Sequence, residues 1–251
     1  MQVLGLVFPQ GKARDVPLAK EIDLEQAIAI LIAAHVLGDF LFQPDWLVNR
    51  KRRPAFRLLH GAIHAALVFV LYQAWTCWTL PLAVLGAHLM IDAVKQRFAL
   101  DTPRAFAWDQ GAHILSLIGI GAVLANAGWL PPFSGVGYQP IIGFAGFVGT
   151  VLGAGFFVGK VAGSIKERNQ LHIDGLVNGG ALIGNLERAL IFLLVFINQP
   201  AGIGFLVAAK SILRFEEAKK QKLAEYVLIG TLLSFSLAIA IAATTQWAMR
   251  F

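Results

Sequence analysis

Apolar stretches long enough to cross a bilayer follow one another along this chain, with short polar breaks between them. A hydrocarbon core about 30 Å thick requires about 20 apolar residues in a helix. We therefore expect spans over the segments 24–46, 57–76, 79–98, 106–128, 140–160, 181–197, 201–215 and 225–247. The segment 201–215 is short enough for a half-helix or a re-entrant segment. The pattern predicts an all-α, polytopic membrane helical bundle with about seven or eight spans.

The same pattern divides the chain into five regions. We expect an N-terminal segment (1–23), a four-helix membrane domain (24–128), a glycine-rich membrane helix (129–163), a cytoplasmic linker (164–180) and C-terminal membrane helices (181–251). The first region lacks the basic start, apolar core and cleavage site of a signal peptide.

Composition supports a membrane location. Charged residues make up 14% of the chain and hydrophobic residues 57%, and the mean hydropathy is +0.66. Soluble domains are nearer one quarter charged, so this inventory cannot cover a water-exposed surface and the lipid bilayer is the expected partner. The net charge of +6 does not indicate nucleic acid, because basic residues in membrane proteins mainly set orientation.

Lysine and arginine concentrate in every second loop, near 47–57, 95–105, 160–180 and after 214. The intervening loops carry neither residue and contain aromatic side chains typical of a membrane interface. The basic loops are therefore predicted to be cytoplasmic. With eight spans both termini would lie outside, but Lys12, Arg14 and Lys20 leave the side of the N-terminal segment open.

Four pairs of polar residues interrupt the first four predicted spans. Both members of each pair lie on one helical face, because they are four residues apart. The pairs are His35/Asp39, His60/His64, His88/Asp92 and Asp109/His113. Ionisable groups inside membrane spans usually have a function, and every pair lies towards a basic loop. We expect one shared site near the cytoplasmic face, with separate interhelical hydrogen bonds as the alternative.

Imidazole and carboxylate groups together form the ligand set of Zn²⁺ and similar ions. We predict a divalent metal, with Zn²⁺ preferred and Mn²⁺ or Fe²⁺ open; two ions bridged by an aspartate would fit, as would one ion supported by the remaining residues. Such an ion activates water for hydrolysis, and Asp39, Asp109 and His64 are the candidate catalytic residues. Gln43 and Gln110 are predicted to orient a ligand or bind substrate, or to form interhelical amide bonds.

The second half of the chain offers different features. The glycines of 140–163 predict a close packing face within the chain or in a homo-oligomer. Four charged residues should lie near the same membrane face as the histidine and aspartate pairs: Glu187, Arg188, Lys210 and Arg214. They either hold the bundle together as ion pairs or form a cationic pocket for a phosphate or lipid headgroup.

The segments His35–Gln43, His88–Asp92 and Asp109–His113 resemble the bacterial integral-membrane family known as domain of unknown function 3307, over roughly residues 27–125. This resemblance implies a multi-pass protein of the bacterial inner membrane, and it supplies no substrate. The pattern more loosely resembles the membrane-bound, metal-dependent hydrolases. More distantly it is similar to the helical zinc phospholipase C group, whose ligands include helical His-x₃-Asp pairs.

We therefore predict a metal-dependent hydrolase that acts on a phosphoester or lipid-headgroup substrate. A divalent-cation or proton-coupled transporter is the first alternative, since histidine and acidic residues also mark ion pathways. A conduction path would require polar groups through the full thickness of the membrane, and the outer halves of these spans are nearly free of them. A non-catalytic membrane signalling or defence module is the second alternative.

Overall fold

The computed structural model describes residues 23–98, 101–172, 178–213 and 221–251. The helices are α1 (Leu24–Phe40), α2 (Asp45–Val48), α3 (Pro54–Tyr72), α4 (Thr79–Phe98), α5 (Pro103–Asn126), α6 (Tyr138–Val148), the π-helix η1 (Gly149–Gly153), α7 (Ala154–Asn169), α8 (Gly179–Phe196), α9 (Ala201–Leu213) and α10 (Gln221–Ala248). No strand occurs in these described ranges, which confirms the all-α prediction.

Local sequence signals fix the starts of several helices. The Asp23 carboxylate accepts hydrogen bonds from the backbone N–H groups of Glu25 and Gln26, both at 3.1 Å, and so caps α1. Thr102 caps α5 by accepting from the N–H of Ala105 at 3.1 Å. Proline opens both α3 and α5, where its missing N–H costs nothing.

A helix lies in each of the eight predicted span segments, but the predicted count of about seven or eight spans is not confirmed. By length and composition, four described helical segments could cross a membrane: Pro54–Tyr72, Tyr138–Asn169, Gly179–Phe196 and Gln221–Ala248. The helix α1 has 17 residues and α9 has 13. In α4 and α5 the histidine and aspartate pairs and their polar neighbours lower the mean hydropathy, because they replace apolar side chains.

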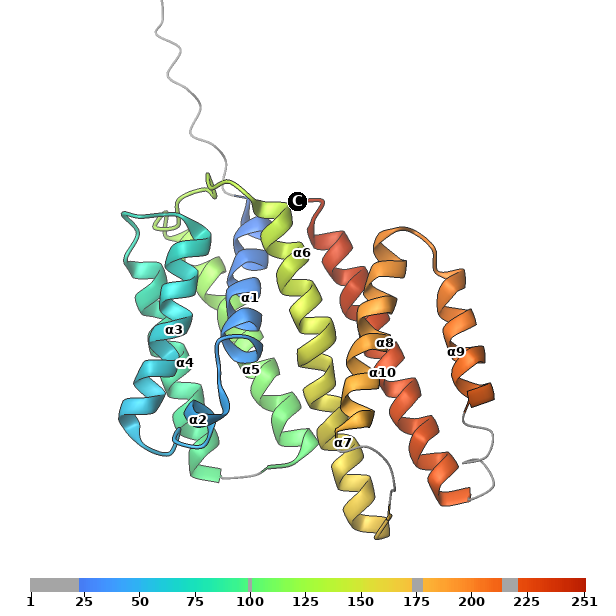
Figure 1. Cartoon of the computed structure of the whole chain (residues 1–251). Coiled ribbons are helices and arrows are strands. Elements are labelled where there is room, and N and C mark those ends of the chain that lie inside the picture. The colour runs from blue at the N-terminus through green and yellow to red at the C-terminus, as the bar shows by residue number, and fades with distance from the viewer. Residues whose placement is uncertain (1–22, 99–100, 173–177, 214–220) are drawn as a thin grey trace, which may run out of the picture.

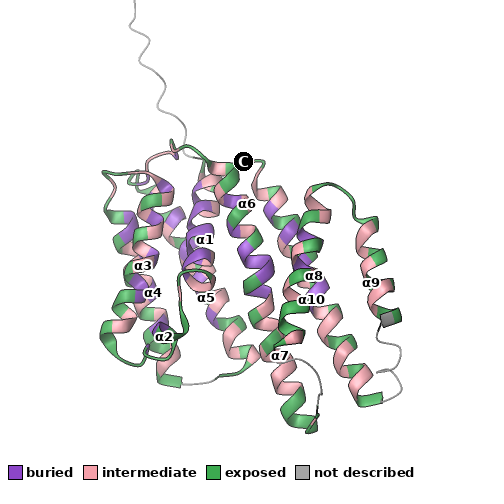
Figure 2. Cartoon of the chain, in the orientation of Figure 1, coloured by how far each residue is buried: buried purple, intermediate pink, exposed green. Residues whose placement is uncertain are grey.

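Helix α1 is the centre of the first half of the bundle, with α3, α5 and α6 packed around it (Figure 1). Its residues Ala27, Ile30, Leu31 and Ala34 have no exposed surface. In the second half α10 packs against α7 and α8. Buried residues concentrate along the inner helix faces, and exposed residues along the outer ones (Figure 2).

Large apolar side chains cover much of the outer surface. Met90 is 65% exposed, Leu115 70% and Phe205 74%. Large apolar side chains on the outer faces of helices are expected where the helices face lipid. The outer surface is therefore compatible with the membrane location that composition predicts.

The two ends of the bundle differ in charge. The basic loop around α2, the carboxyl ends of α4 and α7 and the start of α5 lie at one end, which is the lower end in Figure 1. The opposite end carries the exposed side chains of Trp75, Trp78 and Trp129. The start of α1 and the C-terminus meet there, where the Gln26 side chain donates to the carbonyl oxygen of Phe251 at 2.7 Å.

The glycine-rich segment packs within the chain. A Cβ atom at Gly146 would overlap the side chain of Thr245 in α10, and one at Gly153 would lie 3.0 Å from the ring of Phe40 in α1. Small residues therefore allow α6 and η1 to approach both neighbours. A homo-oligomer contact through 140–163 stays a prediction. Helix α7 continues to Asn169, so the described chain is still helical in the first part of the predicted linker.

Candidate metal centre

Four helices of the first half converge on one buried polar cluster. Helix α1 contributes one of the i, i+4 pairs that the sequence analysis identified, and α3, α4 and α5 each contribute another. The cluster contains His35, Asp39, His60, His64, His88, Asp92, Asp109 and His113. Their side chains are almost fully buried, and the most exposed of them, Asp39, reaches only 9%. We call this set the His/Asp cluster.

Asp39 is the centre of one side of the cluster. Its Oδ1 atom lies 3.2 Å from Nε2 of His60 and 3.2 Å from Nε2 of His64, and its Oδ2 atom lies 3.7 Å from Nε2 of His35. Gln110 donates from Nε2 to Oδ2 of Asp39 at 2.8 Å, and its Oε1 lies 3.2 Å from Nε2 of His35. Gln110 therefore holds two candidate ligands in place.

The five imidazole rings are packed against one another. His60 and His88 face each other with their Nε2 atoms 3.1 Å apart. The ring centroid of His88 lies 3.8 Å from that of His64 and 4.2 Å from that of His113. A cavity of about 10 Å³ remains among His35, His64, His88 and His113. That volume is close to the space needed by a single water molecule or ion.

Two lysines pair with the other carboxylates. Lys95 Nζ lies 2.6 Å from Asp109 Oδ2, and Lys51 Nζ lies 3.7 Å from Asp92 Oδ2. Burial lowers the pKa of Lys51, while the carboxylates of Asp92 and Asp39 oppose this effect. From the sequence alone, both lysines are predicted only to belong to basic loops. The spacing of Asp92 and Lys95, three residues apart on one helix, was the available signal for a cation close to the cluster.

The donor atoms fit a divalent ion. A tetrahedral ion about 2.0–2.1 Å from each nitrogen holds neighbouring donors about 3.3 Å apart, which is close to the 3.1 and 3.2 Å separations around His60. Among the described residues, buried His60 Nδ1, Asp109 Oδ1 and His113 Nε2 have no hydrogen-bond partner. Unpaired buried polar atoms are costly, and a bound cation would satisfy those that face it.

Three overlapping groups have donor atoms within 4.8 Å of one another. They are His35/Asp39/His64/His88, His60/His88/Asp92 and Asp92/Asp109/His113. His88 and Asp92 each belong to two groups, so one or two ions could use the cluster. The mixture of imidazole and carboxylate is compatible with a divalent ion such as Zn²⁺, Mn²⁺ or Fe²⁺.

Residues 27–131, which contain the whole His/Asp cluster, match the family model described as Protein of unknown function (DUF3307). This segment of the chain belongs to the DUF3307 family. The family predicted from the sequence is thereby confirmed, and it carries no assigned activity. No curated protein and no solved structure matches the chain, so the looser resemblance to metal-dependent hydrolases has no support from these comparisons.

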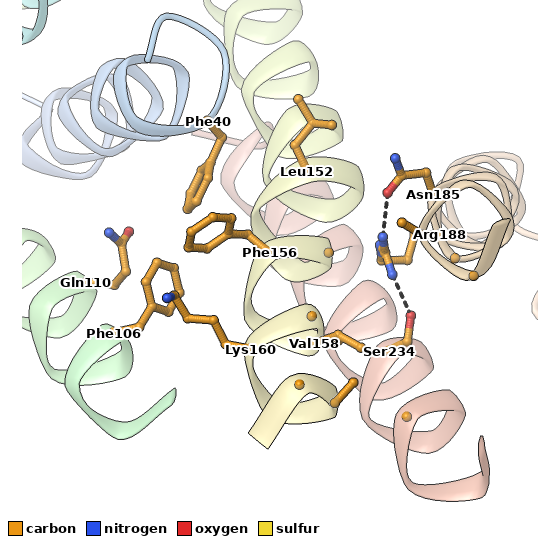
Figure 3. A pocket seen from close by; sticks show the side chains of 18 of the residues that line it. Phe40, Phe106, Gln110, Leu152, Phe156, Val158, Lys160, Asn185, Arg188 and Ser234 are labelled. Atoms are coloured by element: carbon orange, nitrogen blue, oxygen red, sulfur yellow. Dashed lines mark hydrogen bonds between the residues drawn. The ribbon is translucent and has the colours of Figure 1, made fainter. Parts of the chain in front are cut away.

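A cavity of about 870 Å³ joins the DUF3307 segment to the helices that follow it. On the side of the DUF3307 segment it is lined by Asp39, Asp92, Asp109 and Gln110. Phe40, Phe106 and Phe156 also lie along it (Figure 3). The carboxylates of the cluster therefore face the cavity, and among the described residues the imidazoles are not part of its lining.

Gln43 also lines the cavity. With its amide oriented to suit both neighbours, it accepts a hydrogen bond from Lys51 Nζ at 2.9 Å and donates to the carbonyl oxygen of Asp39 at 3.3 Å. Gln43 thus positions the lysine that pairs with Asp92.

The far side of the cavity includes Glu187, Arg188 and Lys210 from α8 and α9. Lys210 Nζ lies 2.7 Å from Glu187 Oε2. Three of the charged residues predicted in the second half are therefore in the same cavity as the carboxylates of the cluster. Arg214 lies outside the described residues.

Gly38 permits the close approach of α1 and α3. A Cβ atom at Gly38 would overlap the imidazole ring of His64. We expect Gly38→Ala to displace this ring and to weaken metal binding about 10–100-fold, as changes in supporting residues commonly do. Titration of metal into chelator-treated protein measures the effect.

The matched control is Gly111→Ala in α5, where an added Cβ meets no heavy atom within 4 Å. This variant should bind metal as the wild type does. Equal affinities for all three proteins would show that His64 is not a ligand.

Proposed function

We propose that this protein is a membrane-bound, metal-dependent hydrolase acting on a phosphoester or lipid-headgroup substrate. The observation that carries the proposal is the position of Asp39, Asp92 and Asp109. These three carboxylates belong to the buried His/Asp cluster and also line the cavity of about 870 Å³. A metal held there would be reached from a space large enough for a small-molecule ligand.

The residues take different roles in this proposal. The five histidines and Asp92 would hold one or two divalent ions, which would supply Lewis-acid stabilisation of negative charge and activate water. Asp39 and Asp109 lie on the cavity wall, where a carboxylate can accept a proton from the attacking water. His64 does not line the cavity, and its Nε2 atom lies 3.2 Å from Asp39 Oδ1. Its role in this proposal is to hold the ion or to orient Asp39.

The distribution of polar groups favours a hydrolase over a transporter. Beyond the imidazoles, towards the end opposite the basic loops, the centre of the first half of the bundle is apolar. Its buried residues there include Ile30, Leu80, Leu117, Leu124 and Leu130. A path for ions would require polar groups through this region.

We place the protein in the bacterial inner membrane, with the basic end of the bundle in the cytoplasm. Lys51, Lys95 and Lys160 line the cavity and belong to this basic end. A substrate would therefore enter from the cytoplasmic side or from the cytoplasmic leaflet.

Metal content and hydrolysis test the chemistry. Purified wild-type protein should contain stoichiometric divalent metal and hydrolyse at least one member of a panel of phosphomonoester, phosphodiester and phospholipid substrates. We expect His88→Ala to lose the metal, since His88 belongs to two donor groups. Its activity should fall roughly 100-fold or more, because the ion contributes several kcal/mol to the transition state.

The control is His172→Ala, which removes the exposed histidine outside the cluster. This variant should retain both metal and activity. Metal-free wild-type protein with an intact fold would refute the proposal. Metal-loaded protein without activity towards any substrate class, with or without chelator, would favour the non-catalytic alternative.

Orientation can be tested with single cysteines in a Cys77→Ser background. Val136 is 82% exposed at the end opposite the basic loops, and Arg52 is exposed in the basic loop around α2. A membrane-impermeant maleimide should label Val136→Cys in intact spheroplasts, and Arg52→Cys only after permeabilisation. The reverse pattern would contradict the orientation, and labelling of both without permeabilisation would contradict a membrane-spanning bundle.

A further inference from the structure

Arg188 is a buried cation whose hydrogen-bond partners are all uncharged. Its residue surface is only 3% exposed. Nε donates to the carbonyl oxygen of Val151 in the π-helix η1 at 3.1 Å, one terminal nitrogen donates to Ser234 Oγ at 2.9 Å, and the other to Asn185 Oδ1 at 2.6 Å (Figure 3). A guanidinium group has five N–H donors, so two of them are not used by these contacts.

The nearest sequence neighbour of opposite charge is already paired. Glu187 forms its ion pair with Lys210 at 2.7 Å, and both side chains are less than one fifth exposed. No described carboxylate lies within ion-pair distance of Arg188. A buried charge without a direct ion-pair partner is unfavourable, and Arg188 lines the cavity, from which an anion could reach it.

Two glycines leave space around the guanidinium group. A Cβ atom at Gly155 in α7 would overlap it, and one at Gly184 in α8 would lie 3.1 Å from its Nη1 atom. Both glycines also line the cavity. The backbone of two helices is therefore shaped around this side chain, which is held in one orientation by η1, α8 and α10.

We infer that Arg188 binds a phosphate group of the substrate, at a subsite of the cavity distinct from the His/Asp cluster. The inference rests on the proposed hydrolase function, and it identifies the chemistry by which a substrate would be selected. A planar guanidinium group with free donors matches the oxygen atoms of a phosphate. Because all its present partners are neutral, its charge is available to the anion.

The arrangement in Figure 3 separates this subsite from the reacting centre. Helix α7 runs between Gln110, which contacts Asp39, and Arg188. Phe156 and Lys160 of α7 lie on the side that faces Phe106 and Gln110, whereas Asn185, Arg188 and Ser234 lie on the other side. The phosphate held by Arg188 would therefore anchor the substrate without being the group that is cleaved.

Phosphate binding to metal-free protein tests this subsite independently of catalysis. Chelator-treated, full-length protein in detergent is titrated with inorganic phosphate and, separately, with short-chain phosphatidic acid in mixed micelles, and heats of binding are measured. Wild-type protein should bind at least one of them. We expect Arg188→Gln to weaken binding about 10-fold or more, since hydrogen bonds to a charged group are among the stronger ones.

The matched control is Arg168→Gln, which removes an exposed arginine at the same end of the bundle and should bind as the wild type does. Arg188→Lys keeps the charge without the planar donor fork and should bind more weakly than wild type; it replaces Arg188→Gln if that variant does not fold. Binding of phosphatidic acid alone assigns a lipid headgroup, and binding of inorganic phosphate assigns a free phosphate group.

The inference is overturned if metal-free wild-type protein binds neither compound, or if a folded Arg188 variant binds them as tightly as wild type. The two proposals can fail separately. A wild-type protein that binds phosphate but no metal would leave the Arg188 subsite standing and refute the hydrolase. A wild-type protein that binds metal, but whose metal-free form binds no phosphate, would refute the Arg188 subsite and leave the hydrolase proposal standing.

Discussion

Burial of the His/Asp cluster is the constraint on which the arrangement of α1, α3, α4 and α5 depends. Polar and charged groups removed from water must find partners inside the protein, so each helix has to turn the face with its pair inwards at one level. Gly38 removes the side chain that would keep His64 away. Lys51 and Lys95 supply positive charge to Asp92 and Asp109. A bound cation would satisfy buried donor atoms of the cluster that have no hydrogen-bond partner.

Under the proposed function, the two halves of the chain would supply the reacting groups and the substrate-binding groups separately. The DUF3307 segment supplies the carboxylates and imidazoles, and the helices after it supply Arg188, Lys210 and Glu187. The π-helix η1 helps to position Arg188, because the carbonyl oxygen of Val151 accepts a hydrogen bond from its Nε atom. Short π-helices often occur at functional sites. The reacting group and the anchoring group of a substrate could therefore be selected by different parts of the chain.

Much of the fold could be predicted from the sequence because hydrophobicity and charge act locally. The i, i+4 spacing predicts that His88 and Asp92 share one helix face. The alternation of basic loops predicts that all four pairs lie at a similar depth near the same membrane face. The span count was less predictable, since the same polar residues lower the hydropathy of α4 and α5. Pairing of Lys95 with Asp109 and the neutral partners of Arg188 depend on contacts between distant segments, which no local pattern specifies.

Spectroscopy of the metal itself tests the central claim most directly. X-ray absorption at the metal edge of purified wild-type protein should show a shell of nitrogen and oxygen ligands at about 2.0–2.2 Å, with the outer-shell scattering of several imidazole rings. Cys77 lies in the loop between α3 and α4, at the end of the bundle opposite the basic loops, so sulfur should be absent from the shell. A spectrum with sulfur ligands, or with oxygen ligands and no imidazole scattering, would contradict a metal centre built from the His/Asp cluster.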